Sequence, residues 1–144
     1  MFKKFFSKKN KDTEQFSGAD ILIAALLIHA AKIDENYTEL EKEIIKKALI
    51  SLTGAQKTDV VKLLTKAEEK EKESNQIFEF TNEIKKKPIE FRFKIIEILW
   101  KIVYSDDAND NYESNLIRRV CGLLYVSDKD SGIIKLKVQN EKKL

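Results

Sequence analysis

The chain has 144 residues, 42% hydrophobic and 35% charged, which is enough apolar material to bury the core of one domain. Four glycines and one proline are too few for the tight turns of a β-sandwich or β-barrel, so an all-α fold is expected. The net charge of +3 argues against a dedicated nucleic-acid-binding surface. One cysteine excludes an internal disulfide, one histidine excludes a three-histidine zinc site, and no glycine-rich phosphate loop is present. We therefore expect neither nucleic acid nor a small-molecule substrate as a ligand.

Residues 1–16 form a basic, aromatic leader ahead of the domain. Met1 to Lys11 contains five lysines and no acid. A helical turn would place its three phenylalanines on one side, next to lysines that favour an anionic surface. The candidates for membrane contact are Phe2, Lys3, Lys4, Phe5 and Phe6. A solubilising arm without membrane contact is the alternative.

The apolar run from Ile21 to Ala31 follows this leader and imitates a secretory signal. Three acids separate the run from the basic residues, and its eleven residues are too few to span a bilayer. The run also has a counterpart in the second half of the chain, which indicates that it is a helix of the folded domain and not a signal peptide. We expect a cytoplasmic protein, peripheral at the inner face of the membrane if the leader binds lipid.

Capping residues predict seven helices and no strand within residues 17–138, followed by a tail at 139–144. The expected helix starts are Ser17, Thr38, Thr58, Ser74, Pro88, Asp110 and Ser127. Gly54 is expected to end the second helix, and the last helix is expected to reach about Val138.

The two halves of the chain align when each residue is compared with the residue 72 positions later. In this register Ile23, Leu26, Leu27 and Ala30 fall on Ile95, Ile98, Leu99 and Ile102. Asp34 falls on Asp106 and Glu41 on Glu113, so the pattern Asp-x6-Glu-x3-Ile occurs twice, each time between two helices. The repeat predicts two helix–loop–helix units packed about a pseudo-twofold axis.

The repeated acids suit two roles. Asp34, Glu41, Asp106 and Glu113 supply hard oxygen ligands of the kind that Ca²⁺ or Mg²⁺ prefers. The EF-hand pattern does not fit, since position 6 counted from Asp106 is Asn111 and position 12 is Ile117. The alternative role is purely structural, because each Glu stands three residues after a capping residue, as in a capping box.

The segment from Leu99 to Asp128 resembles the TerB-like family, named for the tellurite-resistance protein TerB. The shared features are an apolar helix, an Asp followed by a Glu at this spacing, a Leu-Ile-Arg-Arg turn and Leu124-Tyr125-Val126-Ser127, where the family has Leu-Gly-Val-Ser. The resemblance covers roughly residues 18–138. The family glycine after the Asp is Glu35 in one half and Asp107 in the other.

The resemblance implies an all-α domain of about seven helices, acidic metal-binding residues and a link to tellurite resistance, stress responses and membrane-associated complexes. It implies no established enzymatic activity. We therefore expect a non-enzymatic metal-responsive or scaffolding component with a protein partner, such as a membrane protein. The alternative is an interaction module without metal. A hydrolytic metal centre ranks third, because no histidine, oxyanion donor or phosphate loop accompanies the four acids.

Overall fold

Seven α-helices and no strand make up the residues that the computed structural model describes, which are 17–33, 37–73, 77–105 and 111–143. The helices are α1 (Gly18–Ala31), α2 (Glu39–Thr53), α3 (Lys57–Glu73), α4 (Ile77–Ile84), α5 (Ile89–Val103), α6 (Asn111–Leu123) and α7 (Asp128–Lys143). The predicted all-α fold is confirmed.

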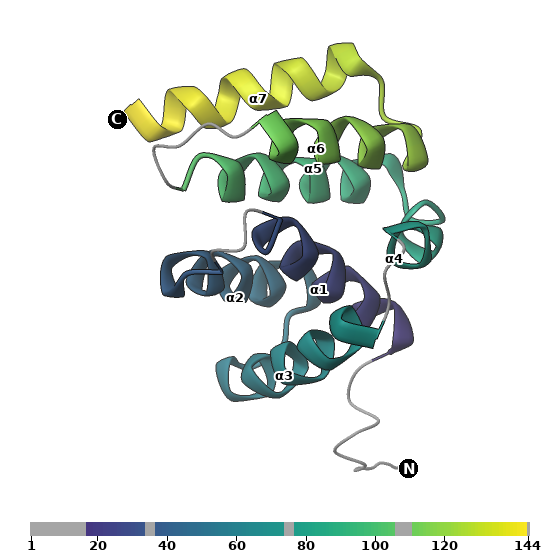
Figure 1. Cartoon of the computed structure of the whole chain (residues 1–144), viewed down its shortest axis with the longest axis vertical. Helices are drawn as coiled ribbons and strands as arrows, with labels where there is room; N and C mark the ends of the chain where they lie inside the picture. Colours follow the sequence, from purple (N-terminus) through teal and green to yellow (C-terminus); the bar gives the residue numbers. More distant parts are fainter. Residues whose placement is uncertain (1–16, 34–36, 74–76, 106–110, 144) are drawn as a thin grey trace.

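The helices form two groups, with α1, α2 and α3 in one and α5, α6 and α7 in the other (Figure 1). α4 lies at one side between them and contacts α1 and α6. α1 contacts α2, α3, α4 and α5, which explains why it is apolar around its whole circumference. Its buried residues are Ile23, Ala24, Ala25, Leu26, Leu27, Ile28, Ala30 and Ala31.

The helix ends follow the predicted caps at three places. The Ser17 side chain accepts a hydrogen bond from the Asp20 amide, and Thr38 forms a complete capping box with Glu41. Gly54 ends α2 with a positive φ of 73°, a conformation that costs glycine little. Local hydrogen bonding therefore determines where α1 begins and where α2 begins and ends.

Two helix boundaries differ from the sequence prediction. α3 begins at Lys57, because the Val60 amide donates to the Gln56 carbonyl, so Thr58 lies inside the helix and does not cap it. α7 continues to Lys143, beyond the expected end at Val138. The Gln139 side chain donates to the Tyr104 hydroxyl at 2.8 Å and holds the extra turn against the end of α5.

The order of the helices follows the 72-residue register. α1 and α5 begin at residues 18 and 89, α2 and α6 at 39 and 111, and α3 and α7 at 57 and 128. α1 packs on α3 as α5 packs on α7, and α1 also contacts α5. α4 has no counterpart among the helices of the described ranges. The pseudo-twofold symmetry of the two halves stays a prediction.

Tyr125 has a φ of 58°, in the left-handed region that favours glycine, and 71% of its surface is exposed. It stands where the family pattern has glycine. We expect Tyr125→Gly to stabilise the protein by about 1 kcal/mol, because the substitution removes backbone strain and few contacts. The measurement is the urea midpoint. A lower midpoint would show that the Tyr125 ring contributes more than its backbone costs.

Candidate functional site

Glu41 is the one predicted metal ligand whose side chain lies among the described residues. Asp34, Asp106 and the Glu113 side chain lie outside them. Within the described ranges, no group of three or more His, Cys, Asp or Glu side chains is placed to hold a metal ion. The four-carboxylate site therefore stays a prediction.

The Glu41 carboxylate is buried and caps α2. Only 1% of Glu41 is exposed, and its Oε1 accepts hydrogen bonds from the Thr38 amide at 2.8 Å and the Thr38 hydroxyl at 3.2 Å. In return, the Glu41 amide donates to Thr38 Oγ1 at 3.1 Å. The predicted capping box of Thr38 and Glu41 is confirmed, and a metal role of Glu41 stays a prediction.

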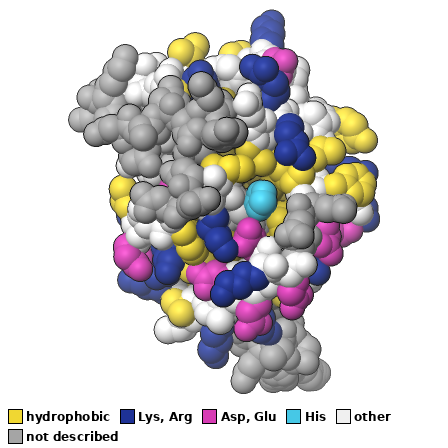
Figure 2. All heavy atoms as spheres, in the orientation of Figure 1, with side chains coloured by type: hydrophobic (Ala, Val, Ile, Leu, Met, Phe, Trp, Pro, Cys, Tyr) yellow, Lys and Arg dark blue, Asp and Glu magenta, His cyan; other side chains and the backbone are white. Residues whose placement is uncertain are grey.

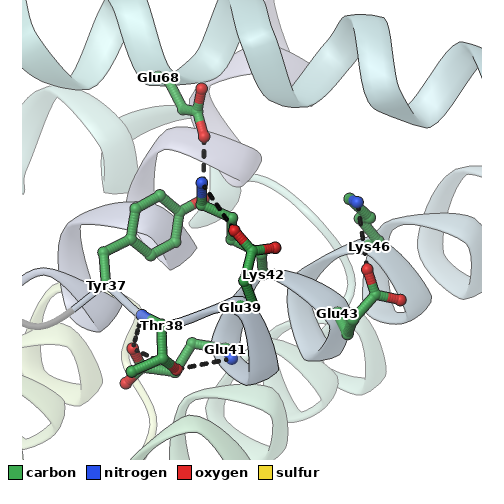
Figure 3. A network of polar contacts seen from close by, with 8 residues as sticks. All are labelled: Tyr37, Thr38, Glu39, Glu41, Lys42, Glu43, Lys46 and Glu68. Atoms are coloured by element: carbon green, nitrogen blue, oxygen red, sulfur yellow. Dashed lines mark hydrogen bonds and ion pairs between the residues drawn. The ribbon is translucent and has the colours of Figure 1, made fainter.

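Tyr37 ties the start of α2 to α3 (Figure 3). Its hydroxyl donates to Glu68 Oε2 at 3.1 Å, and the Lys42 ammonium lies 4.9 Å from the ring centre. Burial raises the pKa of the Tyr37 hydroxyl, and the neighbouring Glu68 carboxylate raises it further. The phenol therefore stays protonated and acts as a donor that fixes the loop to α3.

We expect weak binding of Ca²⁺ or Mg²⁺ that is lost in Asp106→Asn, because the doubled Asp-x6-Glu spacing supplies four carboxylates. Isothermal titration calorimetry of the wild type and the variant measures this directly. No heat from either ion in the wild type, or equal heat in both proteins, would leave the acids with a capping role alone.

His29 takes part in an ion-pair cluster between α1 and α3. His29 Nδ1 lies 3.1 Å from Glu71 Oε2, and Lys32 Nζ lies 2.8 Å from Glu71 Oε1. Burial of Glu71 alone would raise its pKa, but hydrogen bonds from Lys32 and His29 lower it overall. The single histidine reaches the surface near lysine and acidic side chains (Figure 2).

Cys121 and Trp100 belong to the core. Cys121 is 1% exposed, and burial raises the pKa of its thiol. Trp100 is 6% exposed and its indole N–H donates to Ser131 Oγ at 3.2 Å, which links α5 to α7. A thiol held protonated in the core is a poor nucleophile.

A groove of about 450 Å³ lies between α2, α5 and α7. Its floor is apolar and consists of Ile44, Ala48, Leu52 and Ile98. Its rim is basic and carries Lys47, Lys94, Lys101 and Lys137. We call this surface the α2–α5–α7 groove. Its volume and its mixture of apolar floor and polar rim are typical of binding sites.

One acid, Glu97, lies among the four rim lysines. It pairs with Lys137 at 3.2 Å and with Lys101 at 3.3 Å. Burial would raise the Glu97 pKa, but hydrogen bonds from these two lysines lower it overall, so the carboxylate is ionised near neutral pH. Lys47 and Lys94 are exposed and have no ion-pair partner in the described part of the chain. The rim therefore keeps an excess of positive charge.

A second hollow of about 330 Å³ continues the groove toward the start of α2. It shares Ile44 and Lys101 with the groove and adds Leu40, which is 56% exposed. The apolar residues of α2 along this path are Leu40, Ile44, Ala48 and Leu52, each four positions after the last. The path is about 18 Å long at 1.5 Å per residue.

The sequence alone does not reveal this groove. Ile44, Ile45, Ala48 and Leu49 all follow the capping box as apolar residues of α2. In the structure Ile45 and Leu49 are fully buried, whereas Ile44 and Ala48 are half-buried and line the groove. The feature of the sequence that indicates the groove is the wide apolar face of α2, because the core covers only part of a face of that width.

The predicted membrane contacts Phe2, Lys3, Lys4, Phe5 and Phe6 lie outside the described residues, so membrane binding by the leader stays a prediction. None of the helices in the described ranges is both long enough and apolar enough to cross a bilayer.

The chain was compared with protein families, curated proteins and solved structures. The family model described as tellurite resistance protein TerB matches residues 20–136, which include most of α1 and α7 and all the helices between them. No curated protein and no solved structure matches the chain. Because the match covers most of the chain, the protein belongs to the TerB family of tellurite resistance proteins.

Proposed function

We propose that this TerB-family chain is a non-enzymatic component of a tellurite-resistance system that acts by binding a protein partner. The α2–α5–α7 groove carries the proposal. A floor of four apolar side chains under a rim of lysines from three helices suits recognition of another molecule. Glu41 supports binding over catalysis, because its carboxylate is committed to the capping box.

The groove is proposed to act as a scaffold for the partner. The helices that line the groove and the second hollow also form the core, since Ile98 in the groove is 8% exposed and Val138 in the second hollow is 3% exposed. A surface held by packed helices changes little on binding, and this lowers the entropy cost of association.

Metal response is a second proposed function and rests on the doubled Asp-x6-Glu spacing, which the calorimetric titration above tests. Peripheral membrane attachment is proposed on the basis of the five lysines and three phenylalanines of residues 1–11.

Growth on tellurite tests the proposed function in a strain that lacks the gene. We expect Ala48→Trp, which fills the groove, and Lys47→Glu/Lys94→Glu, which reverses its free charge, to lose most of the resistance that the wild type restores. The matched control is Lys62→Glu/Lys129→Glu, which reverses two exposed lysines that do not line the groove. Full resistance from both groove variants at wild-type protein levels would contradict the proposal.

A further inference from the structure

We propose that the occupant of the α2–α5–α7 groove is an acidic amphipathic helix of a partner protein. This inference rests on the proposed function and specifies the chemistry of the partner. Three features of the groove determine that chemistry: its length, the spacing of its apolar residues and the sign of its free charge.

The length of the groove fits a helix of about three turns. Leu40 and Leu52 stand at the two ends of the α2 wall, and the path between them is about 18 Å. The opposite wall runs antiparallel to it along α5, since Lys94 faces the Leu52 end and Tyr104 the Leu40 end. Two long antiparallel walls accommodate an elongated occupant better than a single headgroup or a small ion.

The apolar residues of the groove are spaced for helix packing. Leu40, Ile44, Ala48 and Leu52 form an i, i+4 ridge on α2. Such a ridge packs into the groove of another helix, which presents its own apolar residues at i, i+3, i+4 and i+7. Ala48 stands in the middle of the ridge, and its small side chain leaves room there for a larger side chain of the partner.

The free charge of the groove requires an acidic partner. Lys101 and Lys137 share the one carboxylate of Glu97, whereas Lys47 and Lys94 stand on opposite walls with no ion-pair partner among the residues described. Glu141 lies at the Leu40 end, so four lysines and two glutamates line the two hollows and leave an excess of two positive charges. A helix lying between them with glutamates on both flanks would meet a lysine on each side. The leader of this chain does not meet this requirement, because residues 1–11 hold five lysines and no acid.

A designed peptide of about 15 residues tests the proposal against the full-length protein. The probe is an amphipathic helix with leucines at i, i+4, i+7 and i+11 and glutamates on both flanks. One control peptide replaces every glutamate by lysine, and a second has the acidic composition in scrambled order. Fluorescence anisotropy of the labelled peptides measures each dissociation constant at low and high salt.

We expect the acidic amphipathic peptide to bind at least about tenfold more tightly than either control peptide, with affinity falling at high salt. Lys47→Glu/Lys94→Glu should weaken that binding about tenfold, which corresponds to two exposed charge pairs. Lys62→Glu/Lys129→Glu should leave it unchanged. Ala48→Trp should also abolish binding. If this variant perturbs folding, the charge-reversal variant still tests the groove, because Lys47 and Lys94 are both exposed.

Four results would overturn the proposal. They are equal binding of the scrambled peptide, no binding of any peptide, no effect of the charge reversal, and self-association of the protein through the groove in analytical ultracentrifugation. A separate experiment measures binding to phosphatidylglycerol vesicles. If no peptide binds, and the groove variants lose vesicle binding that the wild type shows, the ligand of the groove is a lipid surface instead. If no peptide binds but the groove variants still lose tellurite resistance, the acidic helix is wrong and the proposed function stands.

Discussion

Leu27→Ala is expected to lower the free energy of unfolding by about 3 kcal/mol. Leu27 is fully buried in α1, the helix that contacts α2, α3, α4 and α5. Truncation removes apolar surface from the core and leaves a cavity that surrounding helices fill only in part. Alanine favours a helix slightly more than leucine does, so the loss comes from packing and not from helix propensity.

Urea denaturation followed by circular dichroism measures this loss. The matched control is Leu136→Ala on α7, because Leu136 is the same residue type with 60% of its surface exposed. It should change stability by less than about 0.5 kcal/mol. A loss below about 1 kcal/mol for Leu27→Ala, or equal losses for the two variants, would contradict the central place of α1 in the core.

Local signals in the sequence were sufficient for the helices. Ser17, Thr38 and Gly54 act within one turn of themselves, so their effects could be predicted without tertiary structure. The errors at Thr58 and Val138 occurred where other contacts decide the boundary. The Val60 amide donates a hydrogen bond to the Gln56 carbonyl. The Gln139 side chain donates a hydrogen bond to the Tyr104 hydroxyl, which lies 35 residues away in the sequence.

The groove could not be predicted in the same way, because it depends on which three helices meet. The spacing of Ile44 and Ala48 is equally suited to the core and to a binding surface. What separates the two outcomes is that α1, α3 and α5 pack against α2, where Ile45 is fully buried, whereas the Ile44 side faces the groove between α5 and α7 and stays partly open. The charge of the rim depends in part on tertiary structure, since Glu97 pairs with Lys101 four residues later on the same helix but with Lys137 only because α7 packs on α5.

The family resemblance supplied what periodicity could not. Apolar spacing and caps alone indicate a helical domain with two acidic loops. The pattern around Asp106 and Glu113 indicates the TerB family, which the family match confirms. The same pattern placed four acids in a predicted cation site. One of those acids, Glu41, now has a structural role that accounts for its spacing from Thr38.

Glu41→Ala is expected to lower the free energy of unfolding by about 2 kcal/mol. The variant removes the acceptor of the Thr38 amide and hydroxyl and leaves a cavity where a side chain with 1% exposure had been. The urea midpoint measures the loss. An unchanged midpoint would show that the capping box does not determine the start of α2.

Glu41→Gln separates the capping role from cation binding. A capping box accepts glutamine, whose amide oxygen can still accept from Thr38, so this variant should lose less than half of what Glu41→Ala loses. The neutral amide is a poorer ligand for Ca²⁺ or Mg²⁺ than a carboxylate, because it lacks the negative charge that a hard cation favours. Near wild-type stability with unchanged heat of cation titration would therefore assign Glu41 to capping alone. Near wild-type stability with the heat abolished would instead make Glu41 a ligand of the cation.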